Sequence, residues 1–219
     1  MRVFLNGGGD GANAQEAYQR FGTAAGKAKP LLYVPLAMEQ ETYPSCFSWI
    51  TGELESLGVK IEMVHSGEEL AGLDLSHFGG GNTYKLLHEL KESGALLKLT
   101  EYLKAGGSVF GGSAGAIILG ADIGTCRYAD ENLAGLSDTA GIDVLSGISL
   151  LCHYGNEDEE ITQRHTTHLL GLSQSGRRIL ALPEEDTVVL NGEKAEVIGT
   201  RPYYLFKEGQ RIECLPGPL

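Results

Sequence analysis

The chain has 219 residues, of which 42% are hydrophobic and 21% are charged, a composition typical of a folded globular protein and unlike that of a disordered chain. With 29 acidic against 17 basic residues, the net charge of −12 disfavours a nucleic acid or an anionic membrane surface as a partner. No apolar run approaches the length of a membrane span, and the four cysteines form no Cys-x-x-Cys pair. We therefore expect a reduced, cytoplasmic protein without a zinc site or a disulfide framework.

Short β-rich runs alternate with amphipathic helical runs over most of the chain, which is typical of an α/β fold with a mostly parallel sheet. Strands are predicted at residues 2–6, 31–36, 59–64, 75–78, 108–110 and 148–152. Helices are predicted around residues 14–21, from Pro44 to Gly58, and at residues 84–92 and 96–104.

The last part of the chain changes character. Five short strands are predicted there, at residues 178–183, 187–191, 196–199, 203–207 and 211–215. Asn191-Gly192 and Glu208-Gly209 are hairpin signals, so we interpret these strands as antiparallel additions to the main sheet. The prediction is therefore a single domain over residues 1–219. The Gly- and Asp-rich stretch 120–147 is predicted to be a long loop that borders a site.

Residues 111–115 read Gly-Gly-Ser-Ala-Gly, which fits the motif Gly-x-Ser-x-Gly. The motif follows an apolar strand and precedes an apolar run, which is the context of a nucleophile elbow. Such a turn needs small neighbours, because it lifts the Ser113 hydroxyl above the sheet edge. The alternative is a Gly-rich turn in which Ser113 caps a helix. The run of small residues favours the elbow.

A second glycine loop, residues 79–81, also follows a short strand and opens a helix. Its backbone N–H groups are suited to a phosphate or to a developing oxyanion. The alternative is a plain turn in which Asn82 or Thr83 caps the helix. No Lys-Ser/Thr pair follows, so the loop is not a Walker-type phosphate loop.

A serine nucleophile needs a base, and six histidines are present. His153 ranks first because it directly follows a predicted strand, and open α/β sheets bind ligands at the carboxyl ends of strands. His165 and His168 lie one helical turn apart; they suit either a metal or, more simply, a solvent-exposed helix. The base also needs an orienting carboxylate, for which Glu184 and Asp130 are the candidates.

The sequence resembles the peptidase E and cyanophycinase family of serine peptidases, which share a fold with the class I glutamine amidotransferases. The motifs that carry the resemblance are GGGNTYKLL (79–87), GGSAGA (111–116), His153 and LPEEDTVVLNG (182–192). They occur in the family's order and span nearly the whole chain. The resemblance implies a three-layer α/β/α sandwich with a mostly parallel, flavodoxin-like central sheet.

The resemblance also implies roles for particular residues. Ser113 matches the nucleophile and His153 the base, while Gly81 and Ala114 match the backbone donors of the oxyanion hole. For the acid, the family leaves Glu184 and an Asp in the loop after the elbow. Simple counting places Tyr128 at that Asp position, with Asp130 two residues on, which favours Glu184. Substrate contacts are expected from Gly80, Asn82 and Thr83.

The implied activity is hydrolysis of small peptides, with N-terminal Asp-X dipeptides as the substrate guess. Gly112 and Ile117 depart from the aspartyl-dipeptidase pattern, and Arg127 and Arg164 are the candidate cations for an acidic side chain. No metal or organic cofactor is expected, and the chain is expected to be a monomer or a homodimer. The alternatives are an esterase or another amide hydrolase on the same triad, a non-catalytic binding protein, and a phosphate-ligand binder that uses the glycine-rich stretches Gly7 to Gly11 and Gly79 to Gly81.

Overall fold

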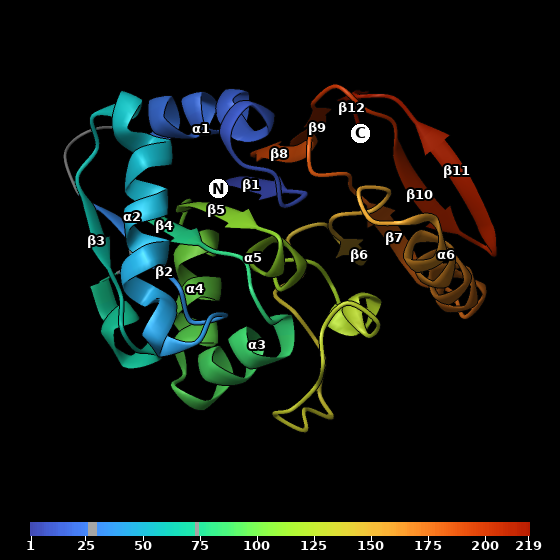
Figure 1. Ribbon diagram of the computed structural model, residues 1–219, viewed down its shortest axis with the longest axis horizontal. Coiled ribbons are helices and arrows are strands. Elements are labelled where there is room, and N and C mark those ends of the chain that lie inside the picture. Colours follow the sequence, from blue (N-terminus) through green and yellow to red (C-terminus); the bar gives the residue numbers. More distant parts are fainter. Residues whose placement is uncertain (26–29, 73–74) are drawn as a thin grey trace.

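Strand β1 (Arg2–Asn6) lies inside an eight-stranded sheet, the larger of two sheets in the computed structural model, which describes residues 1–25, 30–72 and 75–219 (Figure 1). Its strand order is β12-β9-β8-β1-β5-β4-β2-β3. The half formed by β1, β5, β4, β2 and β3 is parallel, whereas β8, β9 and β12 add in antiparallel fashion. The bounds of these other strands are β2 Leu31–Val34, β3 Ile61–Met63, β4 Leu75–Phe78, β5 Ser108–Gly112, β8 Thr187–Asn191, β9 Lys194–Ile198 and β12 Gly217–Pro218.

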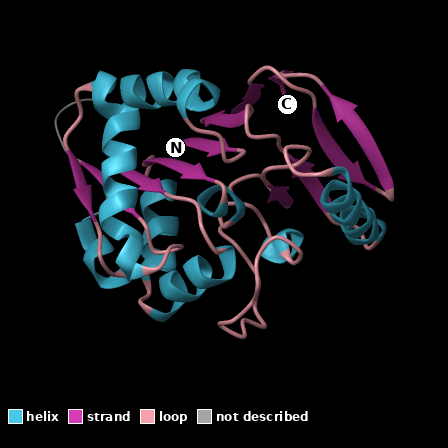
Figure 2. Cartoon of the chain, in the orientation of Figure 1, coloured by secondary structure: helices cyan, strands magenta, loops and turns pink. Residues whose placement is uncertain are grey.

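Helices cover both faces of this sheet, because its central strands are apolar on both sides (Figure 2). Phe4 packs in the core beneath α1 (Gly11–Ala25) and α2 (Tyr43–Leu54), and its ring centroid lies 5.5 Å from that of Phe21. Val3 and Leu5 lie in the core shared with α3 (Thr83–Glu92) and α4 (Ala95–Lys104). This alternation follows from the two-residue period of a strand.

The C-terminal strands divide between two sheets, so the prediction that all of them extend the main sheet is wrong. β7 (Arg178–Ala181), β10 (Tyr203–Lys207) and β11 (Gln210–Cys214) form a separate four-stranded sheet with β6 (Ile148–Leu151), in the order β11-β10-β7-β6. The reason is a local crossover: α6 (Glu159–Gln174) connects β6 to β7, which pair in parallel.

Both predicted hairpins are confirmed. Gly192 lies in the turn between β8 and β9 and has φ of 65°. Glu208 and Gly209 connect β10 to β11 with φ of 54° and 74°, the left-handed pair typical of a two-residue hairpin turn.

The long predicted loop follows α5 (Ala114–Ile117) and contains one 3₁₀ turn, Ile123–Cys126. Asp122 stabilises this loop, because its carboxylate accepts hydrogen bonds from the Gly124 N–H, the Thr139 hydroxyl and the Arg177 guanidinium. Other 3₁₀ turns occupy Gln40–Thr42, Glu55–Leu57 and Gly67–Gly72. In the described ranges, no helix has both the length and the apolar character needed to cross a membrane.

Candidate active site

Ser113 lies on the turn between β5 and α5, where its backbone has φ of 50° and ψ of −114°. This is a strained conformation for a residue other than glycine. The turn is anchored by the Ser113 N–H, which donates to the Asn6 carbonyl at 3.1 Å. A Cβ at Gly111 would come within 2.4 Å of the Gly115 carbonyl oxygen, so only glycine fits there. The predicted strand-to-helix turn is therefore present, with its serine at the strained position.

His153 follows β6 and also has a left-handed backbone, with φ of 58°. Its N–H donates to the Gly7 carbonyl at 2.9 Å, which ties the end of β6 to the loop after β1. The imidazole Nε2 lies 2.8 Å from the Ser113 Oγ, a hydrogen-bonding distance.

Glu184 completes a chain of three side chains. Its Oε1 lies 2.8 Å from the Nδ1 of His153, so both ring nitrogens have partners. Glu184 lies just beyond β7, and its N–H donates to the Asn156 side chain at 2.9 Å. Ser113 thus comes from the eight-stranded sheet, whereas His153 and Glu184 come from neighbouring parallel strands of the four-stranded sheet.

Asp130 is not part of this series of hydrogen-bonded side chains. Its Oδ2 accepts the backbone N–H of Thr83 at 2.9 Å and thereby satisfies a donor in the first turn of α3. Between the two carboxylates that the sequence left open, the structure brings Glu184 to His153 and assigns Asp130 to the helix end.

The glycine loop 79–81 lies next to Ser113. A Cβ at Gly80 would meet the Ser113 Cβ at 3.3 Å, and Gly81 has φ of 128°, which favours glycine. Within the described part of the chain, the N–H groups of Gly81 and Ala114 have no hydrogen-bond acceptor. Two backbone donors are thus available on the two loops that meet at the serine.

Asn82 and Thr83, from which substrate contacts are expected, both lie at the start of α3. Asn82 caps α3 by accepting the Lys85 N–H, and its amide group donates to the Glu131 carbonyl. The Thr83 side chain is fully buried. Asn82 thus fulfils the helix-capping alternative, whereas the Thr83 side chain lies in the protein interior and does not cap the helix.

Sequence reasoning missed the contribution of residues 7–9. A Cβ at Gly8 would lie 2.1 Å from the His153 Cε1, and one at Gly9 would lie 2.3 Å from the Glu184 carbonyl oxygen. The imidazole and the Glu184 backbone therefore pack directly on this loop. The signal was the run of three glycines after the first strand, which was considered only as a phosphate loop.

A cavity of about 520 Å³ opens beside Ser113 and His153. It was not foreseen, because its walls come from α1, the β2 end and α2, which are far apart in the sequence. Besides the catalytic candidates and glycines, the side chains lining it are those of Asn6, Tyr18, Tyr33, Met38, Ser45, Cys46 and Trp49. Gly80, the remaining expected substrate contact, lines this cavity too.

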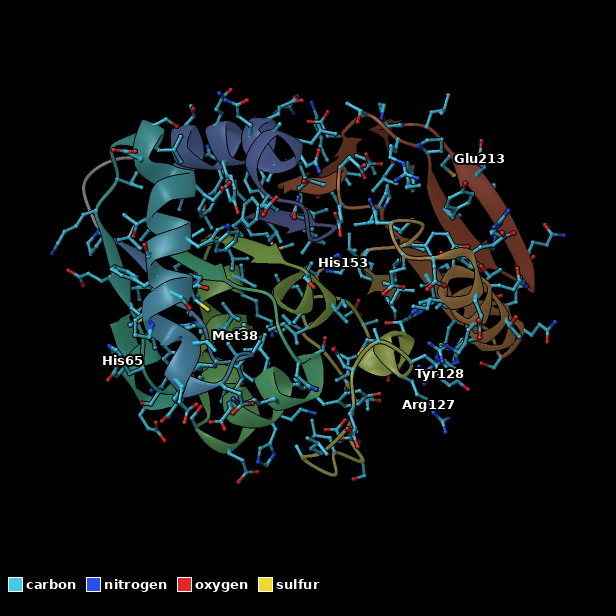
Figure 3. The ribbon with its side chains drawn as sticks, in the orientation of Figure 1. Met38, His65, Arg127, Tyr128, His153 and Glu213 are labelled. Atoms are coloured by element: carbon cyan, nitrogen blue, oxygen red, sulfur yellow. The ribbon has the colours of Figure 1, made fainter. Side chains whose placement is uncertain are left out.

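The two candidate cations lie elsewhere. Arg127 and Arg164 both stack on the exposed ring of Tyr128, at 5.9 and 5.8 Å from its centroid. Neither arginine lines the cavity. In Figure 3, Met38 and His153 lie in the middle of the molecule, whereas Arg127 and Tyr128 lie toward its edge.

The paired histidines of α6 have structural contacts. The His168 Nε2 lies 2.8 Å from the Gly124 carbonyl. His165 is buried, not solvent-exposed as expected, and burial lowers its pKa. In the ranges that the structure describes, no three His, Cys, Asp or Glu side chains are grouped as a metal site would require.

Two of the cysteines, Cys126 and Cys152, are buried. Burial raises the pKa of Cys126 to about 12, and it also raises the pKa of the Cys152 thiol far above its ordinary value. Cys152 lies 3.6 Å from the Ser113 carbonyl oxygen. A thiol held neutral in this way is a poor nucleophile, which favours the serine.

Comparisons with known proteins agree with this geometry. Residues 3–198 match the family model described as Peptidase family S51. A Peptidase E of Pasteurella multocida (strain Pm70) is 28% identical over 202 residues, covering 87% of this chain and 83% of the relative. The uncharacterized peptidase Lmo0363 of Listeria monocytogenes (serovar 1/2a, strain EGD-e) is 31% identical over 186 residues, covering 80% of this chain and 87% of the relative.

The fold is also found in a solved structure of a peptidase from an acI-B1 Actinobacterium. That structure has a TM-score of 0.72 and 17% identity, and the match covers 97% of this chain and 93% of the other. Sequence and fold together define the protein as a serine-type peptidase. The chain belongs to Peptidase family S51, so the resemblance noted from its motifs is confirmed.

Proposed function

We propose that the protein hydrolyses small peptides with Ser113 as nucleophile, His153 as general base and acid, and Glu184 as the residue that orients the imidazole. The observation that carries the proposal is the continuous series of two 2.8 Å contacts, from Ser113 Oγ to His153 Nε2 and from His153 Nδ1 to Glu184 Oε1. With Glu184 accepting the Nδ1–H, the Nε2 atom is left as the proton acceptor that a serine nucleophile requires.

In the first step, the Ser113 Oγ attacks the carbonyl carbon of the scissile peptide bond and its proton passes to the Nε2 of His153. The carbonyl π electrons move to oxygen, which becomes an oxyanion. The N–H groups of Gly81 and Ala114 then donate to that oxyanion, and one such donor contributes about 3 kcal/mol to transition-state stabilisation. Glu184 stabilises the imidazolium that has formed.

In the second step, the C–N bond breaks and His153 gives its proton to the leaving amine, which leaves an acyl group on Ser113. A water molecule then attacks this ester while His153 accepts a proton from it. The second tetrahedral adduct collapses, the Ser113 oxygen regains a proton, and the carboxylic acid product departs. The proposed steps use water, these side chains and the backbone N–H groups of Gly81 and Ala114.

The size of the site supports small peptides as substrates. The cavity of about 520 Å³ beside Ser113 is the volume of a few amino acid residues, and it is lined on one side by the loop 79–81. The family resemblance implies Asp-X dipeptides. The cavity wall, which has no Lys or Arg among the described residues, favours a different residue.

The test uses wild type and Ser113→Ala with a fluorophosphonate probe and a set of dipeptides. We expect covalent labelling of wild type only, and at least a roughly 10⁴-fold loss of hydrolysis in the variant with an unchanged circular dichroism spectrum. If folded wild type takes up no probe, the protein is a binding module and the proposal is overturned. Hydrolysis of short-chain esters in preference to every peptide would identify an esterase instead.

A further inference from the structure

We propose that the cavity beside Ser113 binds an uncharged apolar or aromatic side chain of the residue whose carbonyl is attacked, so that Phe, Tyr or Leu is preferred there over Asp. This inference rests on the proposed function, because it takes Ser113 as the nucleophile. It concerns the chemistry of the cavity walls, which are independent of the catalytic side chains.

Apart from the catalytic candidates, Asn6 and Ser45, the side chains that line the cavity are aromatic or contain sulfur. Tyr18 on α1 and Tyr33 on β2 are 4% and 2% exposed, so their rings belong to the protein interior and form the deep part of the cavity. Met38 follows β2, and Trp49 on α2 is 39% exposed at the cavity opening. Aromatic and methionine side chains favour apolar ligands, which they contact over large areas.

The position of the cavity indicates which substrate residue enters it. Gly80, Gly81 and Ser113 line both the cavity and the place where the attacked carbonyl would lie. The Cα of the residue that carries this carbonyl is one bond away from it. Its side chain is therefore the part of the substrate that reaches the space between Tyr33, Met38 and Trp49.

The described residues of the cavity wall include no lysine or arginine that could pair with a carboxylate ligand. Among the described residues that line it, none is Lys, Arg, Asp or Glu. A nearby ammonium, that of Lys85, donates to the Met38 carbonyl and lies 3.2 Å from the Glu39 carboxylate. Burying an aspartate side chain without a cationic partner is costly, so this wall selects against it.

The surrounding charge has the wrong sign for an acidic substrate. The carboxylates of Asp10 and Glu53 lie close enough to Tyr18 that their negative charge adds to burial in raising its pKa. These two carboxylates would repel a further negative charge inside the cavity. A lysine side chain would escape that repulsion, but the wall offers no carboxylate to pair with its ammonium, so neutral side chains fit best.

The first experiment compares the dipeptides Phe-Ala, Leu-Ala, Asp-Ala and Lys-Ala as substrates of wild type. We expect kcat/KM for Phe-Ala and Leu-Ala to exceed that for Asp-Ala and Lys-Ala by roughly tenfold or more. The variant Trp49→Ala should lower kcat/KM for Phe-Ala by roughly tenfold while changing Ala-Ala less than about threefold. Tyr128→Ala, which removes another exposed aromatic side chain outside the cavity, is the matched control and should change neither.

The second experiment measures ligand binding in the cavity without hydrolysis. Trp49 is the only tryptophan of the sequence, so its fluorescence reports on the cavity opening. In Ser113→Ala, N-acetyl-phenylalanine amide should cause a saturable change in fluorescence, and N-acetyl-aspartate amide at the same concentrations should not. A saturable response to the aspartate compound alone, or Asp-Ala as the best substrate, would overturn the inference. Saturable phenylalanine binding in a wild type that neither hydrolyses peptides nor takes up the fluorophosphonate would overturn the proposed function, and with it the assignment to the attacked residue, and would leave only the apolar preference of the cavity.

Discussion

The Nδ1 of His153 lies 2.8 Å from the carboxylate of Glu184, and the two residues follow neighbouring parallel strands, β6 and β7. Parallel strands deliver their carboxyl ends to the same sheet edge, so this pairing is a direct result of the β6-α6-β7 crossover. The other candidate acid, Asp130, is engaged at the start of α3. The two carboxylates are therefore expected to respond differently to mutation.

Glu184→Gln should lower kcat by roughly 10²- to 10⁴-fold with little change in KM, because a neutral amide neither fixes the imidazole tautomer nor stabilises the imidazolium. Asp130→Ala should keep kcat within about threefold of wild type and lower the free energy of unfolding by about 1 kcal/mol, since it removes an acceptor from a helix end. Steady-state kinetics and urea unfolding of both variants check this prediction. The reverse pattern would make Asp130 the orienting acid.

Gly8→Ala should reduce kcat by roughly 100-fold, because its Cβ would lie 2.1 Å from the His153 ring and displace the imidazole from Ser113. Gly11→Ala is the matched control. It begins α1 two residues after this glycine run and has a positive φ of 48°, but a Cβ there would meet nothing within 4 Å. We expect near-normal kcat for the control. Equal losses in the two variants would show that backbone strain, and not the contact with His153, is responsible.

Iodoacetamide should not inactivate the variant Cys46→Ser at pH 8. Cys126 and Cys152 are buried, and their raised pKa values keep both thiols protonated at that pH. The Cys46→Ser background is needed because Cys46 lines the cavity, where an alkyl group would obstruct substrate. Residual activity and peptide mass spectrometry give the readout. Activity lost in step with alkylation of Cys152 would point to a cysteine nucleophile.

Asp186 should make the protein less stable as the pH rises from about 4 to 6. It is fully buried with no hydrogen-bond partner for Oδ2, and burial raises its pKa to about 6. Between the ordinary pKa and this value the folded state holds a proton that the unfolded state has lost, so raising the pH favours unfolding, by about 3 kcal/mol in all.

The variant Asp186→Asn isolates this contribution, since its amide oxygen can still accept the N–H groups that Oδ1 accepts from Thr200 and Arg201. Its free energy of unfolding, minus that of wild type, should rise by about 3 kcal/mol between pH 4 and pH 7 in urea titrations. The other carboxylates are present in both proteins, so their contribution to the pH dependence cancels in the difference. A difference that does not vary with pH would mean that the pKa of Asp186 is the same in the folded and the unfolded state.

Local patterns predicted much of the fold. β1 and β4 have the predicted bounds, and helix α3 begins one residue before the predicted start, because alternation and helical periodicity are properties of neighbouring residues. The assignment of β7 and β10 to a second sheet could not be predicted. It depends on which strands pair, and packing of Tyr154 on Tyr204 and Phe206 contributes to that choice between residues distant in sequence.

The site divides in the same way. Local signals predicted Ser113 and His153: a turn of small residues for the serine and the end of a strand for the histidine. Their contact is explained by the meeting of these strand ends in the fold. The choice of Glu184 over Asp130 needed coordinates, since both follow plausible elements. The burial of the Thr83 side chain could not be predicted, because its sequence neighbours do not show that it points into the core. The aromatic cavity wall left no local pattern at all.

Ser113 comes from the eight-stranded sheet, whereas His153 and Glu184 come from the four-stranded sheet. Under the proposed roles, peptide binding and proton transfer are therefore carried out by different halves of the molecule. The aromatic walls belong entirely to the eight-stranded half of the molecule. A mutation that displaces only the four-stranded sheet would move His153 and Glu184 together and leave the aromatic cavity wall intact. Such a protein would capture its peptide and fail to release it as products, acting as a trap in place of an enzyme.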